Sequence, residues 1–155
     1  MARDLTIVSG GQTGVDRGAL DAALEAGAGC DGWCPAGRLA EDGTVPDRYP
    51  LRELAGGYEH RTRQNVVDSD GTLVIHRAPP TGGTLFTLRC CAELAKPVCR
   101  IDAAATAAAE AARTAREFVA AHGIRRLNVA GPRASGWAGG HEYARATVAG
   151  LLRGD

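Results

Sequence analysis

The fold is decided by residues 5–27, LTIVSGGQTGVDRGALDAALEAG. Within them the spacing of apolar residues changes once, from that of a buried strand to that of a helix. Residues 5–8 form a short apolar run rich in β-branched side chains that ends in Ser-Gly-Gly, and such a run predicts a buried strand followed by a turn. From Thr13 onward apolar residues recur every three or four positions until Gly27, which predicts a helix over residues 13–26. The stretch therefore predicts a strand, a glycine-rich loop and a helix in that order.

The same order repeats along the rest of the chain. PPTGGT (79–84) joins an apolar run to a stretch of helical period, and GPRASGWAGG (131–140) does so again. The predicted strands are 5–8, 30–34, 72–75, 98–101 and 127–130, and the predicted helices are 13–26, 59–68, 85–95, 103–121 and 142–152. Strands that alternate with helices indicate a mainly parallel sheet covered on both faces. We therefore expect an α/β fold, a Rossmann-like three-layer sandwich of about five mainly parallel strands, with residues 1–155 as a single ligand-binding domain.

Residues 28–58 show no clear hydrophobic period. Gly, Pro, Asp, Arg and Glu are scattered through them, and only a short strand within 30–34 is predicted. We expect the remainder to be a long ordered loop. Because such loops are uncommon in compact domains unless they are functional, this one is expected to cover or build a site.

The charge balance limits the classes of partner. Eighteen basic and eighteen acidic residues cancel, so the sequence predicts neither a nucleic-acid partner nor a membrane surface. No run approaches the roughly 20 apolar residues of a membrane span, and the start of the chain lacks a basic region followed by a long apolar one. We therefore expect a cytoplasmic protein in which any anion site is local.

The reactive side chains do not form a recognisable catalytic or metal-binding pattern. Five cysteines are an odd number without paired CxxC spacing, and the four histidines are dispersed. No GxSxG motif or equivalent supplies a nucleophile. We therefore predict no catalytic and no metal-ligating residues, and buried reduced thiols, with a redox pair of Cys30 and Cys34 as an open alternative.

Two glycine-rich loops form the candidate site. In SGGQTG (9–14) the glycines let backbone amides approach an anion, and Ser9 and Thr13 supply hydroxyl groups. TGGT (81–84) also precedes a helix, and because both loops follow strands of a parallel sheet, both are expected at its carboxyl edge. Together they predict the binding of a phosphorylated small molecule, although each loop alone is equally compatible with a tight strand-to-helix turn.

Charged residues near these loops are further candidates. Arg133 in GPR (131–133) either adds a guanidinium at the same edge or lies in a surface turn. Asp16 is either a hydrogen-bonding contact or a partner of the helix dipole. Arg61 or Arg63, on the predicted helix that leads to the second loop, either reaches the ligand or belongs to a solvated face.

Longer motifs resemble a known family. The segments IVSGGQTGVDRGALDAALEAG, GWCPAGRLAEDGTVPDRYPL, RTRQNVVDSDGTLVI and GGTLFT resemble the molybdenum carrier family, whose studied members bind molybdenum cofactor. This family lies within the Rossmann-like superfamily that also contains the cytokinin-activating, lysine-decarboxylase-like phosphoribohydrolases. The resemblance implies a homodimer or homotetramer that holds molybdenum cofactor (molybdopterin) by its phosphate and protects it or delivers it to molybdoenzymes, without needing catalysis. Carried over by motif, the ligand-facing positions are Gly10, Gly11, Gln12, Thr13, Gly14, Arg38, Thr81, Gly82, Gly83, Thr84 and Arg133.

Two departures from the related patterns matter. The phosphoribohydrolases carry a Glu one helix turn after their glycine loop, whereas GGTLFT places Thr87 there and no carboxylate follows before Glu93. Hydrolysis of nucleoside monophosphates is therefore not expected. In WCPAG, Ala36 stands where the resemblance implies a basic residue, so one anion contact is expected to be missing. A nucleotide-binding enzyme and a nucleotide sensor stay as alternatives, because phosphate-holding loops say little about what the phosphate is attached to.

Overall fold

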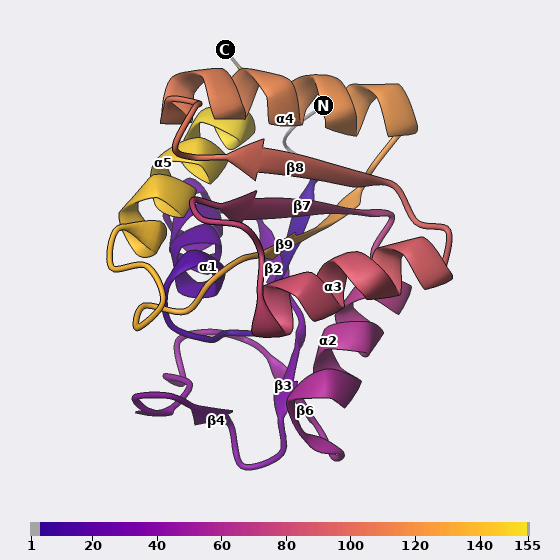
Figure 1. Cartoon of the computed structure of the whole chain (residues 1–155), viewed down its shortest axis with the longest axis vertical. Coiled ribbons are helices and arrows are strands. Elements are labelled where there is room, and N and C mark those ends of the chain that lie inside the picture. The colour runs from indigo at the N-terminus through magenta and orange to yellow at the C-terminus, as the bar shows by residue number, and fades with distance from the viewer. Residues whose placement is uncertain (1–3, 155) are drawn as a thin grey trace.

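A five-stranded parallel sheet forms the centre of the computed structural model, which describes residues 4–154 (Figure 1). Its strands, in spatial order, are β2 (Gly29–Asp31), β1 (Thr6–Val8), β9 (Arg126–Ala130), β7 (Gly71–His76) and β8 (Val98–Asp102). Neighbouring strands run parallel throughout, with Ile7 beside Leu127 and Leu73 beside Val129. The predicted fold class, an α/β Rossmann-like sandwich of about five mainly parallel strands, is confirmed.

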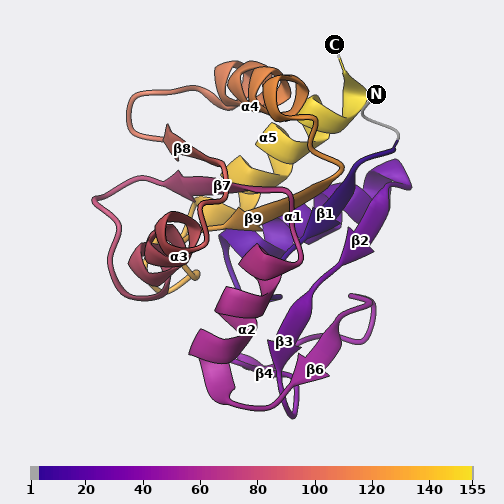
Figure 2. The ribbon, with the colours of Figure 1, turned by 90° about the vertical axis from the view of Figure 1, so that its right-hand side faces the viewer.

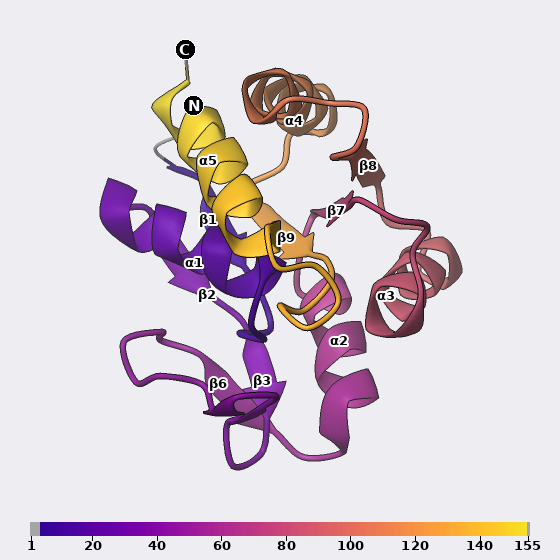
Figure 3. The same cartoon turned by 60° about the vertical axis from the view of Figure 1, so that its left-hand side comes forward.

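Helices cover both faces of this sheet (Figures 2 and 3). The helices α1 (Val15–Ala26), α4 (Ala108–His122) and α5 (Gly140–Arg153) lie on one face, and α2 (Gly57–Val67) and α3 (Gly82–Glu93) lie on the other. α1 and α5 approach closely because residue 18 is a glycine, where a Cβ would lie 2.2 Å from the carbonyl oxygen of His141. Of the helices described here, none is long and apolar enough to cross a membrane.

The main core lies between the sheet and the layer of α1, α4 and α5. β7 is buried along its whole length, as are Leu127 and Val129 of β9. Ala111 and Ala115 of α4 pack into the same cluster, so these two alanines are part of the core of a single chain. Burial on both faces explains why β7 carries the uninterrupted apolar run Leu73–Ile75 instead of an alternating pattern.

Residues 33–54 form a side lobe in place of most of the long loop that the sequence predicted (Figure 1). Within it β3 (Trp33–Pro35) pairs with β6 (Arg52–Leu54), and β4 (Leu39–Ala40) pairs with β5 (Gly43–Thr44). The sequence did not predict β4, β5 and β6, because strands of two or three residues without an apolar run leave no periodic signal. The lobe packs on α1 through a small second core, which consists of Leu20, Cys34, Val45, Tyr49 and Leu51.

The predicted strand 30–34 is two strands that belong to different sheets. β2 ends at Asp31 and β3 starts at Trp33, with Gly32 between them at φ +144°. A Cβ at residue 32 would lie 1.9 Å from the carbonyl oxygen of Ser9, so a glycine is required at this turn. All five predicted helices begin two to five residues away from their predicted starts. They begin at Val15, Gly57, Gly82, Ala108 and Gly140, and the largest difference is that of α4. The alanines before residue 108 favour a helix without fixing where it begins.

Candidate functional site

A cleft of about 830 Å³ opens at the carboxyl ends of β1, β7 and β9. Its walls are formed by the two glycine-rich loops, by α2 and by the loop before α5. The lining includes Gly10, Gln12, Asp16, Tyr58, Arg61, Thr62, Asn65, residues 77–84, Thr87 and most of residues 128–137. A cleft of this size fits a small organic ligand, and its location is the one expected for ligand sites on parallel sheets.

The structure brings part of the predicted site together in this cleft. The predicted residues that line it are Gly10, Gln12, Thr81, Gly82, Gly83, Thr84 and Arg133. Those that lie outside its lining are Ser9, Gly11, Thr13, Gly14 and Arg38. Of the two candidate arginines on α2, Arg61 lines the cleft, whereas Arg63 lies 3.6 Å from the carboxylate of Glu93.

The second glycine loop presents the N-terminus of α3 to the cleft. Thr81 precedes the first helical turn, and no side chain of the described residues caps this end. A Cβ built at Gly82 or Gly83 meets no atom of residues 4–154 within 4 Å, so both residues border open space. Backbone N–H groups without intrahelical partners and the positive end of the helix dipole favour an anion here.

The first glycine loop differs, because several backbone N–H groups at this end of α1 have partners within the protein. The N–H of Gln12 donates to the Asp16 carboxylate at 3.2 Å, and the N–H of Thr13 donates to the Gln12 side chain at 3.0 Å. The N–H of Val15 donates to the carbonyl of Pro132 at 3.3 Å. The N-terminus of α1 therefore offers an anion fewer free amides than that of α3, although the sequence suggested that the two loops are equivalent.

The glycines of the first loop make room for protein atoms. Residue 10 faces the Arg61 guanidinium, which a Cβ would meet at 1.6 Å. Gly11 has φ +78°, and a Cβ there would lie 2.6 Å from the side chain of Leu51 in the side lobe. The glycine pattern that predicted an anion loop is thus explained in part by the close packing of Arg61 and of the side lobe.

A buried ion pair lies in the cleft. Arg61 and Asp16 are each only 7% exposed, and Nη1 of Arg61 is 3.9 Å from Oδ2 of Asp16. Burial raises the pKa of the Asp16 carboxyl from 3.8 to about 6, an effect that the Arg61 guanidinium partly offsets. Within residues 4–154 the Nε of Arg61 has no hydrogen-bond partner. A buried guanidinium with an unused donor is suited to bind an anionic group.

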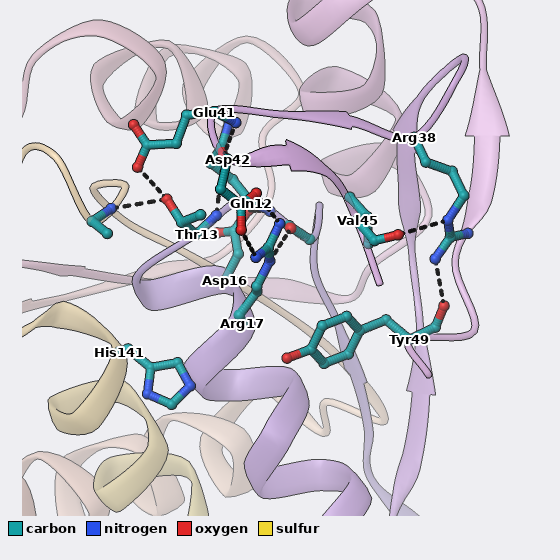
Figure 4. A network of polar contacts seen from close by, with 12 residues as sticks. Gln12, Thr13, Asp16, Arg17, Arg38, Glu41, Asp42, Val45, Tyr49 and His141 are labelled. Atoms are coloured by element: carbon teal, nitrogen blue, oxygen red, sulfur yellow. Dashed lines mark hydrogen bonds and ion pairs between the residues drawn. The ribbon is translucent and has the colours of Figure 1, made fainter. Parts of the chain in front are cut away.

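The Glu41 hairpin, residues 38–45, connects the side lobe to two loops beside the cleft (Figure 4). The Glu41 carboxylate accepts a hydrogen bond from the Thr13 hydroxyl. It also accepts from the N–H and the hydroxyl of Ser135, at 3.1 and 2.6 Å, and Nε of Arg133 lies 3.9 Å away. The Thr13 hydroxyl, which the sequence predicted to hold the ligand, therefore holds Glu41.

Arg38 has a structural role in the side lobe. Its guanidinium donates to four backbone carbonyls, at 2.9–3.1 Å, which are those of Val45, Pro46, Tyr49 and Leu51. Because these bonds engage the guanidinium away from the cleft, we do not include Arg38 in the ligand site. Ala36 lies exposed in the same lobe, outside the lining of the cleft, so a basic residue at that position would also be remote from it.

Three further residues of the cleft were not predicted from the sequence. Arg77 directly follows β7, so its place at the carboxyl edge of the sheet was a usable signal. Trp137 also lines the cleft, and the same signal applied to it, because the loop 131–140 follows a predicted strand. Tyr58 lines the cleft as well, and the sequence around it contains no motif that indicates this. These residues add one cationic and two aromatic side chains to the surface around the glycine loops.

The cysteines do not support a redox pair. Within the described chain all five are free thiols. Burial raises the pKa of Cys30 to about 11 and also raises the pKa of Cys34, whereas reactive thiols have lowered pKa values. Across residues 4–154 no group of three or more His, Cys, Asp or Glu side chains is arranged to hold a metal ion.

Variants at two glycines separate packing from ligand binding. Gly11→Val is expected to destabilise the protein strongly, because residue 11 has φ +78° and a side chain there collides with Leu51. Gly83→Val is expected to leave folding intact and to weaken phosphate binding several-fold, because its side chain enters the open space beside the α3 amides. Circular dichroism melting and a phosphate titration measure the two effects. Normal binding by the Gly83 variant would remove the α3 terminus from the site.

Comparison with known proteins agrees with this architecture. A model of the circularly permutated YpsA SLOG family matches residues 7–152. The chain is also similar to the crystal structure of a protein from Syntrophus aciditrophicus SB that is described as a putative molybdenum carrier protein. The sequence identity is 39%, the TM-score is 0.93, and the match covers 97% of this chain and 96% of that one. No curated protein matches the chain. The shared structure therefore spans the regions of both the cleft and the side lobe.

Proposed function

Because this chain belongs to the circularly permutated YpsA SLOG family, we propose that it is a binding protein for a small molecule that carries a phosphate or similar anionic group. The observation that carries this proposal is the buried Arg61 in the cleft, whose Nε lacks a hydrogen-bond partner among residues 4–154. The N-terminus of α3 borders the same cleft. We propose as ligand contacts Gly10, Gln12, Arg61, residues 81–84 and Arg133.

We further propose molybdenum cofactor, a phosphorylated pterin, as the cargo. The cleft volume of about 830 Å³ exceeds what phosphate alone requires, and Tyr58 and Trp137 supply aromatic faces on which a planar heterocycle can stack. The description of the Syntrophus aciditrophicus SB protein as a carrier of molybdenum favours this ligand over other phosphorylated heterocycles. In this role the whole chain acts as one ligand-binding domain that delivers the cofactor to molybdoenzymes.

Mass spectrometry of the small molecules released from anaerobically purified protein tests this proposal. We expect a phosphorylated pterin, in an amount that falls when Arg61 is replaced by glutamine and is unchanged when Arg63 is replaced. Titration calorimetry with adenosine monophosphate, guanosine monophosphate and a phosphorylated pterin then ranks the ligands. Release of no phosphate-bearing molecule, together with no binding in the titrations, would falsify the proposed function.

One observation favours a second function, the hydrolysis of a nucleoside monophosphate. The sequence predicted no carboxylate near the second glycine loop, but the fold brings Asp16 of α1 into the cleft, and burial raises its pKa to about 6. A carboxyl with a pKa near neutrality is suited to general acid–base chemistry. Chromatography of adenosine monophosphate incubated with the protein decides between the functions. Free adenine whose release is lost in Asp16→Asn would establish an enzyme, and intact nucleotide supports the carrier.

We also propose that the chain self-associates into a homodimer or homotetramer. Val67 and Val98 are large apolar side chains that are 41% and 40% exposed. Closed symmetric homo-oligomers are the commonest assemblies of soluble proteins, and exposed apolar side chains are suited to such an interface. Sedimentation velocity at micromolar concentration is therefore expected to show a species of at least twice the 16.0 kDa of one chain. A single species of monomer mass, unchanged on concentration, would contradict self-association.

A further inference from the structure

Arg61 already faces one negative charge, the Asp16 carboxylate. Oδ2 of Asp16 lies 3.9 Å from Nη1 of Arg61 and accepts a hydrogen bond from the N–H of Gln12 at 3.2 Å. The side chains of Arg61 and Asp16 are 9% and 10% exposed, and both residues line the cleft. An anionic group that binds Arg61 from the cleft therefore comes close to a second anion in a region with little water, where like charges repel strongly.

The other cations near the pair do not remove this repulsion. The second guanidinium that acts on Asp16 is that of Arg17, and it donates two hydrogen bonds to Asp42, at 2.6 and 2.8 Å. Arg77 and Arg133 also line the cleft, but both are exposed, so solvent and salt screen their charges. Asp16 and the ligand therefore compete for the buried guanidinium of the ion pair.

We propose that the cleft binds an anion together with one proton, and that Asp16 is the residue that holds this proton. The inference rests on the proposed anion site and adds its regulation by pH. On binding, the Asp16 carboxylate takes one proton from the acid form of the buffer, which becomes its conjugate base, and Asp16 becomes a carboxylic acid. This leaves the Arg61 guanidinium to the anion and gives the anion an O–H donor as well. The buried charge then consists of one cation and the ligand.

In the free protein, the Asp16 carboxyl already takes up this proton at mildly acidic pH. Burial raises the pKa of Asp16 to about 6, with the Arg61 guanidinium as the largest opposing influence. A bound anion that interacts with the same guanidinium raises the pKa further, so binding and proton uptake are linked at neutral pH. Affinity is expected to fall by up to about tenfold per pH unit above pH 6, because one proton is taken up for each anion bound.

Sulfate is the probe for this linkage, because it has no titrating proton between pH 5 and pH 8. We expect amide NMR signals of the cleft to shift on addition of sulfate, relative to chloride at the same ionic strength. In protein with ¹³C-labelled aspartate carboxyls, the pKa of Asp16 is expected to rise by about one unit or more. Asp16→Asn is expected to bind sulfate without pH dependence. The control Asp21→Asn, on the same helix and paired with Tyr49 and His141, keeps that dependence.

The outcomes separate this inference from the proposed function. If the cleft signals do not respond to sulfate at pH 5, the anion site itself is wrong, and the linkage fails with it. If they respond while the pKa of Asp16 stays unchanged, or if Asp16→Asn keeps the wild-type pH dependence, the proton linkage is overturned and the anion site stands. Should Asp16→Asn fail to fold, the titration of the wild-type carboxyl decides alone.

Discussion

Replacing Arg61 with glutamine is expected to weaken sulfate or phosphate binding by roughly 30-fold or more, because truncating one partner of a buried charge pair costs about 2–5 kcal/mol. The Arg61 side chain is 9% exposed, and its Nε lacks a hydrogen-bond partner within the described chain, so part of its bonding capacity is not used by the fold. Isothermal titration calorimetry at pH 5.5, where Asp16 is mostly protonated, measures this loss.

Two further variants show which property of Arg61 matters. Arg63→Gln removes an exposed arginine from the same helix, and because its contact with Glu93 at 3.6 Å is a surface ion pair, affinity is expected to stay unchanged. Arg61→Lys keeps the charge but loses the planar fork of donors, so partial binding is expected. Wild-type affinity in a correctly folded Arg61→Gln protein would place the ligand elsewhere.

The main sheet was predictable because its strands contain short apolar stretches that alternate along the chain with stretches of helical period. β7 is buried along its whole length and contains the apolar run Leu73–Ile75, whereas in β9 the apolar Leu127 and Val129 flank the buried Asn128. The meeting of the two glycine loops at one edge also follows from parallel pairing. Gly10, Gln12 and residues 81–84 do line one cleft, although the first loop reaches it with fewer free amides than expected.

The side lobe was not predictable because contacts between distant parts of the sequence hold it in place. The N–H of Trp33 donates to the side chain of Asn65, which is 32 residues away. The Glu41 carboxylate accepts from the N–H of Ser135, which is 94 residues away. No local pattern in residues 28–58 encodes such partners. For the same reason, residue type alone could not show that Arg38 binds backbone carbonyls instead of a ligand.

Asp16→Asn is expected to change how stability depends on pH. Burial raises the pKa of Asp16 from 3.8 to about 6, so the folded protein holds this proton more tightly than the unfolded chain does. The resulting stability is fully present below pH 3.8 and is lost as the pH rises through 6. A shift of about two pKa units corresponds to about 3 kcal/mol of unfolding free energy. In urea unfolding, the advantage of the variant over the wild type is therefore expected to be larger at pH 8 than at pH 4, by up to that amount.

A carboxylate with the opposite shift provides the control for this prediction. Hydrogen bonds from Arg17 lower the pKa of Asp42 below 3.8, so its contribution to stability is present above that pH and is lost only as the pH falls below it. The stability difference between Asp42→Asn and the wild type is therefore expected to stay nearly constant between pH 4 and pH 8. If the stability difference between Asp16→Asn and the wild type is likewise constant with pH, the pKa of Asp16 is not raised and Arg61 stabilises Asp16 as an anion. The proposed proton uptake is then wrong. An advantage of Asp16→Asn that grows from pH 4 to pH 8 would mean that the fold retains a destabilising carboxylate in its cleft, as proteins do where a binding site needs one.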